Sequence, residues 1–229
     1  MVTYDGLLTF TDTYIMLYFE QNYKSFGIFY KLFYVNQVRK DEKLWRLLWG
    51  YGNPGKEYEK TRHNLGFLVL DKVAEKFNVN IEKAKLNGII GETRSGNEKI
   101  LLVKPTTYMN LSGNCVVDIL NFYKATSQDL IVIYDDIDIE VGKIKVKSSG
   151  SPGTHNGMRD ITNKIGTKDF TRVRVGSGKP SNGQNLADYV LSNFRKEELV
   201  EIDSAIMNAT EAVIEILKNG VNSAMNKFN

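Results

Sequence analysis

The chain has 229 residues, of which 42% are apolar and 25% charged, so it is long and apolar enough to bury the core of one globular domain. Its single cysteine, Cys115, excludes an internal disulfide and a Cys-x-x-Cys motif, which favours the cytoplasm. A net charge of +3 is too small to indicate a nucleic-acid-binding protein, so any RNA contact must come from a local basic surface.

The first 43 residues differ in composition from the rest of the chain. Aromatic residues crowd into them, but Glu20, Lys24 and Lys31 interrupt every apolar run before it reaches the roughly 18 residues that a membrane span needs. The basic start and cleavage site of a signal peptide are also missing. We therefore expect an extension or a wrongly assigned start at residues 1–43, to which we assign no function, and a single domain at residues 44–229.

The domain begins with alternating signals for strands and helices. Short apolar runs between turn residues predict strands, and apolar residues three or four positions apart predict amphipathic helices. In chain order, we expect a strand at residues 47–49 that ends in the loop 50–55, a helix over 64–77, strands at 89–94 and 99–104, and a helix with Asn110 as its N-cap.

The second half of the domain continues this alternation. A continuous apolar run at residues 130–134 predicts a central strand, which ends at Asp135 and Asp136 with their carboxylates exposed in the crevice beyond it. The remaining expected elements are a strand with Ile144 and Val146 on one face and Lys143, Lys145 and Lys147 on the other, a helix after His155, a strand at 171–176, and a helix from Leu199 to Leu217 before a short tail. This order predicts an α/β fold.

His63 and His155 are the only histidines in the chain, and both lie at predicted junctions between a loop and a helix. Histidine exchanges a proton near neutral pH, so these two are the first candidates for a general base. The alternative for each is a loop-capping role. A catalytic zinc site usually has three ligands including a closely spaced pair, which these histidines do not form. Because a Gly-x-Ser-x-Gly motif is also missing, water is the favoured nucleophile.

Polar side chains that could assist a base lie in the loops. A carboxylate at the strand end, from Asp135 or Asp136, can orient an imidazole and stabilise its protonated form. The amides of Asn53, Asn110 and Asn156, each in a glycine-flanked loop, can donate to a developing oxyanion without adding charge. The alternatives are a solvated turn for the carboxylates and turn or cap roles for the amides.

Five motifs, taken in order, resemble those of bacterial-type peptidyl-tRNA hydrolases over about residues 46–229. They are Gly52-Asn53-Pro54-Gly55 with Tyr58, Thr61-Arg62-His63-Asn64, Pro105-Thr106-Thr107-Tyr108-Met109-Asn110-Leu111-Ser112-Gly113, Asp135-Asp136-Ile137-Asp138 and His155-Asn156-Gly157. The resemblance implies one domain, with a twisted mixed β-sheet surrounded by α-helices. It also implies hydrolysis of the ester that joins a peptide to tRNA.

The resemblance also implies the role of each site residue. His63 is the general base that activates water, and Asp135 supports it. Catalysis falls to His63, Asp135, Asn53 and Asn110, substrate binding to Tyr58, Tyr108, Asn110, His155 and Asn156, and tRNA binding to Lys145, Lys147 and Arg174. Period-two geometry independently puts the two lysines on one face of a strand, although a solvated strand would look the same. We expect a cytoplasmic monomer that uses no metal or other cofactor and contacts no membrane.

The chain departs from the family pattern beside the site, and two other functions remain open. Trp49 and Tyr51 replace smaller or aliphatic residues, and Ser151-Pro152-Gly153-Thr154 replaces a glycine-richer run, which predicts a loop before His155 that is stiffer or differently placed than in relatives. One alternative is a non-catalytic RNA-binding relative, because the same fold resembles a chloroplast RNA-splicing factor. The other is a hydrolase of small esters or peptides, for which the lysine face would be incidental.

Overall fold

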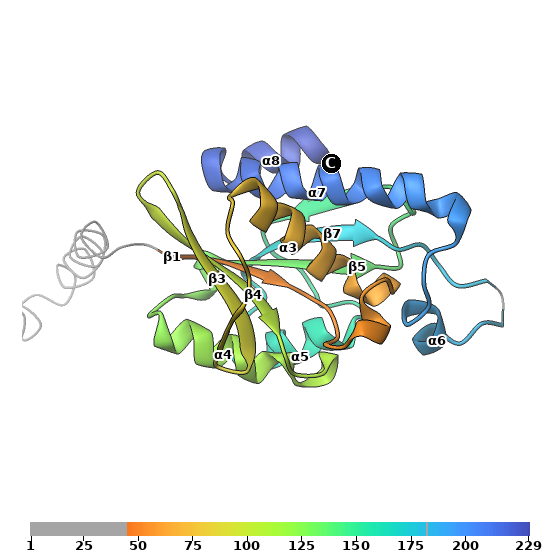
Figure 1. Ribbon diagram of the computed structural model, residues 1–229, viewed down its shortest axis with the longest axis horizontal. Coiled ribbons are helices and arrows are strands. Elements are labelled where there is room, and N and C mark those ends of the chain that lie inside the picture. The colour runs from red at the N-terminus through yellow and green to blue at the C-terminus, as the bar shows by residue number, and fades with distance from the viewer. Residues whose placement is uncertain (1–44, 182) are drawn as a thin grey trace, which may run out of the picture. The chain divides into compact units, whose positions relative to one another are not determined.

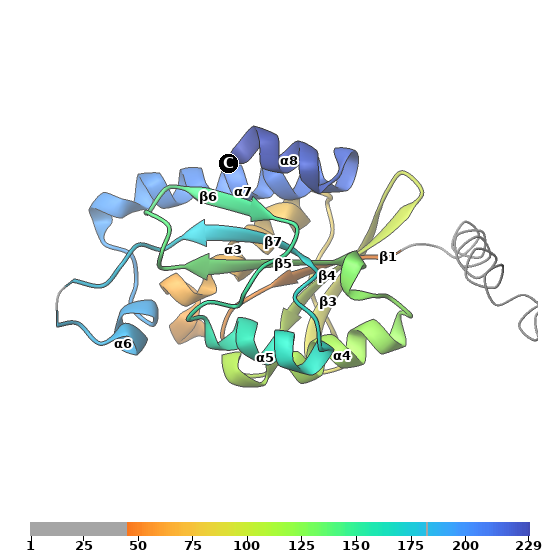
Figure 2. The same cartoon turned by 180° about the vertical axis from the view of Figure 1, so that it is seen from behind.

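The computed structural model describes residues 45–181 and 183–229, without the side chain of Asn110, so the predicted extension at residues 1–43 lies outside the described residues. The described strands form one twisted sheet with helices on both faces (Figures 1 and 2). The strands are β1 Trp45–Gly50, β2 Lys83–Lys85, β3 Gly88–Ser95, β4 Glu98–Pro105, β5 Leu130–Asp136, β6 Ile144–Lys147 and β7 Thr171–Gly176. The α-helices are α3 Leu65–Lys76, α4 Ser112–Phe122, α5 Asn156–Ile165, α6 Leu186–Val190, α7 Leu199–Asn219 and α8 Val221–Phe228.

The sheet has the strand order β2-β3-β4-β1-β5-β7-β6. Its centre is parallel, because β1 pairs in parallel with β4 and β5, and β5 with β7. Both ends are antiparallel, through the pairs β2–β3, β3–β4 and β6–β7. The predicted mixed sheet is therefore confirmed. The parallel strands end at one edge, which brings the loops after β1, β4, β5 and β7 together.

Two apolar cores lie on opposite faces of the sheet. On one face, α3, α7 and α8 cover the sheet, and on the other α4 and α5 do so (Figure 1). The central strands are buried on both faces, which explains why β1 and β5 have continuous apolar runs rather than an alternating pattern. None of the described helices is long and apolar enough to cross a membrane.

The structure corrects three sequence-based expectations. The 3-10 helix η3, Met109–Leu111, precedes α4, whose N-cap is Leu111, so the prediction of Asn110 as that N-cap was wrong. The expected C-terminal tail is the helix α8. Asp135 is only 2% exposed, so its carboxylate is buried rather than exposed at the strand end. Neither β2 nor α6 was predicted, because elements of three and five residues are too short to show a period.

The C-terminal residue covers the edge of the sheet at β6. The Asn229 side chain accepts a hydrogen bond from Val146 N at 2.7 Å and donates one to Val146 O at 2.9 Å. These bonds imitate the pairing of one more strand residue and satisfy two backbone groups that an edge strand leaves open. The same strand holds Lys145 and Lys147 with their side chains exposed.

Candidate active site

A cavity of about 590 Å³ opens where the parallel strands end. Loops after β1, β4 and β5, the segment before α5, and α6 all contribute to its wall. The lining residues are Asn53, His63, Tyr108, Met109, Asp135, Asp136, Ile137, Pro152, Gly153, Thr154, His155, Asn156, Leu186, Ala187, Val190 and Leu191. The structure therefore brings most of the predicted catalytic and substrate-binding residues to one cavity. Tyr58 is half-buried and does not line it.

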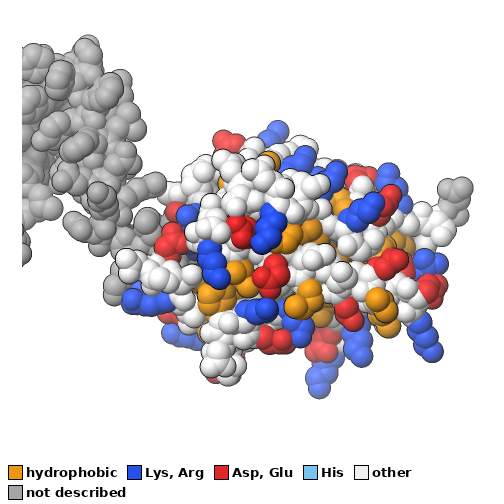
Figure 3. Space-filling model, turned by 90° about the horizontal axis from the view of Figure 1, so that it is seen from above, with side chains coloured by type: hydrophobic (Ala, Val, Ile, Leu, Met, Phe, Trp, Pro, Cys, Tyr) orange, Lys and Arg blue, Asp and Glu red, His pale blue; other side chains and the backbone are white. Residues whose placement is uncertain are grey.

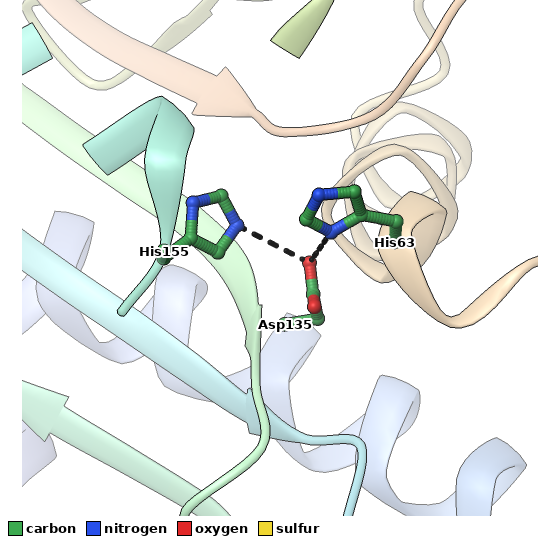
Figure 4. Close-up of side chains that lie close together, drawn as sticks. All are labelled: His63, Asp135 and His155. Carbon is green, nitrogen blue, oxygen red and sulfur yellow. Dashed lines mark hydrogen bonds and ion pairs between the residues drawn. The ribbon is translucent and has the colours of Figure 1, made fainter. Parts of the chain in front are cut away.

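His63 lies in the 3-10 helix η2, Arg62–Asn64, directly before α3. A Cβ on Gly66 would clash with the backbone atoms Ile133 O and Tyr51 N, so only glycine lets α3 begin this close to the ends of β1 and β5. This close approach brings His63 Nδ1 to 2.8 Å from Asp135 Oδ1 (Figure 4). The imidazole is 13% exposed and the carboxylate 2%. The pair is thus nearly closed off from bulk water but reaches the cavity.

The electrostatics of this pair favour an ionised Asp135. Burial raises the pKa of Asp135, but the charges of and hydrogen bonds from His63 and His155 outweigh burial and hold it well below its usual range. Burial lowers the pKa of His63, but the charge of Asp135 and the hydrogen bond to it outweigh that effect and raise it. The carboxylate therefore stabilises the protonated form of the His63 imidazole.

His155 approaches the same carboxylate oxygen from the start of α5, with its Nε2 at 3.3 Å from Asp135 Oδ1 (Figure 4). Its Nδ1 accepts a hydrogen bond from Met158 N at 3.2 Å and so caps the helix. Nδ1 is therefore unprotonated and Nε2 carries the hydrogen. An ionised carboxylate only accepts hydrogen bonds, so the His63 nitrogen that faces it, Nδ1, carries a hydrogen too. His63 Nε2 then keeps a lone pair, as a general base requires.

The same three side chains have the composition of a metal site. The ligand atoms of His63, Asp135 and His155 lie within 4.8 Å of one another. A metal ion would need the lone pair of His155 Nε2, whereas the cap on α5 requires the proton to be on that nitrogen. Coordination would therefore break the helix cap, and the observed hydrogen bonds favour an imidazole–carboxylate site over a metal centre.

An amide network fixes the loop after β1. Asn53 N donates to Asn64 Oδ1 at 2.9 Å, and Asn64 Nδ2 donates to Asn53 O at 3.0 Å. Asn53 Oδ1 accepts from Met109 N at 3.4 Å, so Nδ2 is the atom that this amide can offer to a ligand. Sequence reasoning missed the positioning role of Asn64, although its place directly after His63 was visible. Asn156 lies at the start of α5, and Asn110 lies in η3.

Arg62 anchors the turn that carries His63, and it was not predicted. Its guanidinium donates to Glu198 Oε2 at 2.6 Å and to Ser177 O at 3.0 Å. It also lies 4.4 Å from the ring centroid of Tyr189 and 4.5 Å from that of Phe194. Because α6 supplies one wall of the cavity and contains Tyr189, Arg62 joins this wall to the turn that holds the candidate base.

We expect Glu198→Gln to destabilise the fold by about 3–5 kcal/mol at neutral pH, because it leaves Arg62 buried without a counter-charge. Burial raises the pKa of Glu198, but its bonds to Arg62 and Arg195 lower it from 4.5 to about 2. The ionised carboxylate thus stabilises the fold fully above pH 4.5 and progressively less as pH falls toward 2. Urea unfolding should show that the difference in unfolding free energy between wild type and Glu198→Gln becomes smaller as the pH falls below 4.5.

Glu197→Gln is the matched control for this prediction. It makes the same chemical change one residue earlier, where the side chain is 67% exposed and forms an ion pair with the exposed Arg195. We expect its unfolding free energy to stay within about 0.5 kcal/mol of wild type. Equal unfolding curves for Glu198→Gln and Glu197→Gln would contradict a stabilising role for the buried pair.

Two arginines hold the loop before His155. Arg172 Nη1 donates to Ser151 O at 2.6 Å, and Arg159 Nε donates to Gly153 O at 3.0 Å. Tyr51, which departs from the family pattern, also contacts this region. Its hydroxyl donates to Gly157 O at 2.6 Å, and its ring centroid lies 5.2 Å from that of His155. These contacts tie the loop to α5, β7 and the end of β1, and its predicted stiffness stays a prediction.

The predicted tRNA-binding residues lie on the β6–β7 edge of the sheet. Lys145 and Lys147 are exposed, and Lys145 lies opposite Arg174 in the strand register. Arg174 forms an ion pair with Asp136. Lys143 lies just before β6 and pairs with Glu140. The face on the α7 and α8 side mixes side chains of both charge signs (Figure 3).

The fold and the cavity together define an α/β protein with an imidazole–carboxylate site at the carboxyl ends of its parallel strands. The family described as peptidyl-tRNA hydrolase matches residues 47–229. A peptidyl-tRNA hydrolase of Clostridium botulinum is 50% identical over 183 residues, which cover 80% of this chain and 96% of that protein. One of Caldanaerobacter subterraneus is 48% identical over 180 residues, which cover 79% and 97%.

A solved structure shows the same likeness. The crystal structure of peptidyl-tRNA hydrolase from Acinetobacter baumannii has a TM-score of 0.76 at 35% identity, covering 80% of this chain and 94% of that one. This chain therefore belongs to the peptidyl-tRNA hydrolase family. It is thus a hydrolase of a family that acts in translation, and the resemblance inferred from its motifs is confirmed.

Proposed function

We propose that this chain hydrolyses the ester bond between peptide and tRNA in peptidyl-tRNA, and so recycles tRNA from stalled translation in the cytoplasm. His63 is the general base. The observation that carries the proposal is the 2.8 Å hydrogen bond between His63 Nδ1 and Asp135 Oδ1 at the wall of the cavity. It leaves His63 Nε2 with a lone pair, and family membership supplies the substrate class.

The proposed reaction has two steps and needs no covalent enzyme intermediate. His63 Nε2 takes a proton from a water molecule as the water oxygen attacks the acyl carbon of the ester. The tetrahedral intermediate then collapses, the bond from that carbon to the ribose oxygen breaks, and the imidazolium returns the proton to that oxygen. The products are tRNA and the peptide carboxylic acid, which releases its proton to solvent and leaves as the carboxylate. Asp135 stabilises the imidazolium and keeps the ring oriented.

Amide groups complete the proposed site. Asn53, Asn110 and Asn156 position the peptide and the water and donate hydrogen bonds to the oxyanion. A donor of this kind is worth about 10²–10³ in rate, and a positioned base about 10²–10⁴. An ester is already an activated acyl group, so these contributions suffice without a metal ion or other cofactor. His155 helps to hold the Asp135 carboxylate in place.

The wall of the cavity suits a peptide more than a free amino acid. Its lining includes the apolar side chains of Leu186, Val190 and Leu191 from the α6 segment, and that of Pro152. Burying an unpaired ammonium among such side chains is costly, so an acylated α-nitrogen is preferred and ordinary aminoacyl-tRNA is spared. Tyr108, which is 63% exposed at the cavity, contributes to substrate binding.

The tRNA body is proposed to contact the β6–β7 edge through Lys145, Lys147 and Arg174. Their ammonium and guanidinium groups bind backbone phosphates, so tRNA binding weakens as salt rises. We infer that the protein acts as a monomer.

Two alternative functions predict different results. A hydrolase of small esters with the same fold would turn over at a rate that salt hardly affects. A non-catalytic RNA-binding relative would retain tRNA binding and release no peptide.

Peptide release from N-acetyl-aminoacyl-tRNA in the presence of a chelator tests the proposal. We expect multiple turnovers with the chelator present, and slow or no release from the free aminoacyl-tRNA that serves as the control. Activity that disappears with the chelator and returns with added zinc would contradict the metal-free mechanism. Equal rates on both substrates would contradict the preference for an acylated nitrogen.

A further inference from the structure

One of the three basic residues on the β6–β7 edge already has an anionic partner. Arg174 Nε donates to Asp136 Oδ2 at 2.7 Å, and Arg174 Nη2 lies 2.6 Å from the same oxygen. The Nε–Nη2 side of a guanidinium is a fork that can clamp a phosphate or carboxylate with two parallel bonds. In Arg174 a carboxylate occupies this fork. The Arg174 side chain is 20% exposed and that of Asp136 12%, so water screens the pair only in part.

Asp136 lies on the same side of the sheet as the basic residues. Side chains alternate along a strand, so Asp136 and Asp135 leave β5 on opposite faces. Lys145 is directly opposite Arg174 in the antiparallel register, which puts both on one face, and the Asp136–Arg174 ion pair extends that face to β5. Asp136 is therefore a carboxylate within the basic edge, one residue from the partner of the candidate base.

Asp136 also starts the turn that leads out of β5. Its Oδ1 accepts from Asp138 N at 3.0 Å, while its Oδ2 holds Arg174. Asp136 and the next residue, Ile137, both line the cavity. Asp136 therefore belongs both to the basic edge and to the cavity wall. One of its oxygens holds the turn and the other holds Arg174.

We propose that Asp136 is an internal competitor for the phosphate that Arg174 binds. This inference rests on the proposed tRNA contact at the β6–β7 edge. A backbone phosphate takes the fork of Arg174 only by displacing Asp136, so part of the binding free energy goes into breaking the ion pair. Asp136 thereby keeps tRNA affinity moderate, weakens retention of other polyanions, and speeds release of the tRNA product. Asp136 acts on tRNA binding through Arg174.

Asp136→Asn is the direct test, because asparagine has nearly the same shape and can still accept from Asp138 N through Oδ1. We expect the dissociation constant for deacylated tRNA to fall by about fivefold, since one competing charge is removed. The slope of log K against log salt should stay close to that of wild type, because Arg174 contacts phosphate in both complexes and only the cost of displacing Asp136 is removed. Asp136→Glu, which retains the charge, should restore weaker binding.

A double-mutant cycle isolates the pair from its surroundings. In the Arg174→Gln background, Asp136→Asn should no longer tighten tRNA binding. Asp138→Asn is the matched control, because it removes the same charge two residues away, where the side chain is 58% exposed and pairs with the exposed Lys179. It should change binding by less than about twofold. Thermal unfolding of each variant checks that the fold persists.

The outcomes separate this inference from the proposed function. If Lys145→Ala, Lys147→Ala and Arg174→Gln all leave tRNA binding unchanged, the proposed tRNA contact is wrong and the competition at Arg174 falls with it. If these three weaken binding while Asp136→Asn also weakens it, Asp136 orients Arg174 instead of competing with phosphate. That result overturns the inference and leaves the proposed function standing. Equal tightening by Asp136→Asn and Asp138→Asn overturns it too.

Discussion

Replacing His63 with alanine is expected to lower kcat for peptide release by about 10²–10⁴-fold, because the water nucleophile then lacks a positioned base. Binding of tRNA should stay close to wild type, since the proposed phosphate contacts lie on β6 and β7. Single-turnover release from N-acetyl-aminoacyl-tRNA with a chelator measures the chemical step, and a tRNA-binding titration measures affinity. The single-turnover rate should fall, and the affinity for tRNA should not change.

Chemical rescue distinguishes a lost base from a damaged fold. The alanine variant leaves a space beside the Asp135 carboxylate, and free imidazole in that space should recover part of the rate. A buffer amine of similar pKa that is too large for the space should not do so. If His63→Ala released peptide at the wild-type rate, another group would be the base and the proposed mechanism would be wrong.

Asp135→Asn is expected to cost a similar factor of about 10²–10⁴ in kcat, for a different reason. The asparagine amide can donate to His63 Nδ1, which favours the tautomer with its proton on Nε2, the atom that must accept one from water. The pH profile should also move. Asp135 raises the pKa of His63 against the effect of burial, so without its charge burial dominates and that pKa falls.

The direction of this shift provides the decisive measurement. The base works unprotonated, so the wild-type rate rises with pH through the raised pKa of His63. In Asp135→Asn the acidic limb of the rate profile should lie at lower pH, with a much lower plateau. Asp138→Asn, an exposed change to the same residue type, should leave both limb and plateau in place. An unmoved acidic limb in Asp135→Asn would contradict the assignment of that limb to His63.

Much of the fold was predictable from local patterns. The continuous apolar run of β5 and the alternating lysines of β6 indicated a buried strand and a half-exposed strand, and the structure has both. The helices predicted from regular spacing are present because burial of one apolar face is what stabilises them. Short elements such as β2 and α6 were missed, since pairing and packing with distant segments define them.

The candidate site was predictable to a lesser degree. His63 and His155 were candidates for the base because the chain has no other histidine, and the motifs indicated the family. The burial of the Asp135 carboxylate could not be predicted, because burial at the end of a strand depends on the helices that cover that end. The ion pair between Arg174 and Asp136 was not predictable either, since Asp136 is on another strand, 38 positions earlier in the chain.

By itself, the sequence determined which groups are available for chemistry, the alternation of strands and helices, and the family to which the chain belongs. Only the tertiary structure decided that two imidazoles 92 positions apart share one carboxylate oxygen, and which nitrogen of each carries the hydrogen. The physical reason is that hydrogen-bond distances and burial arise from packing between distant segments. Local patterns record only which face of each segment is apolar.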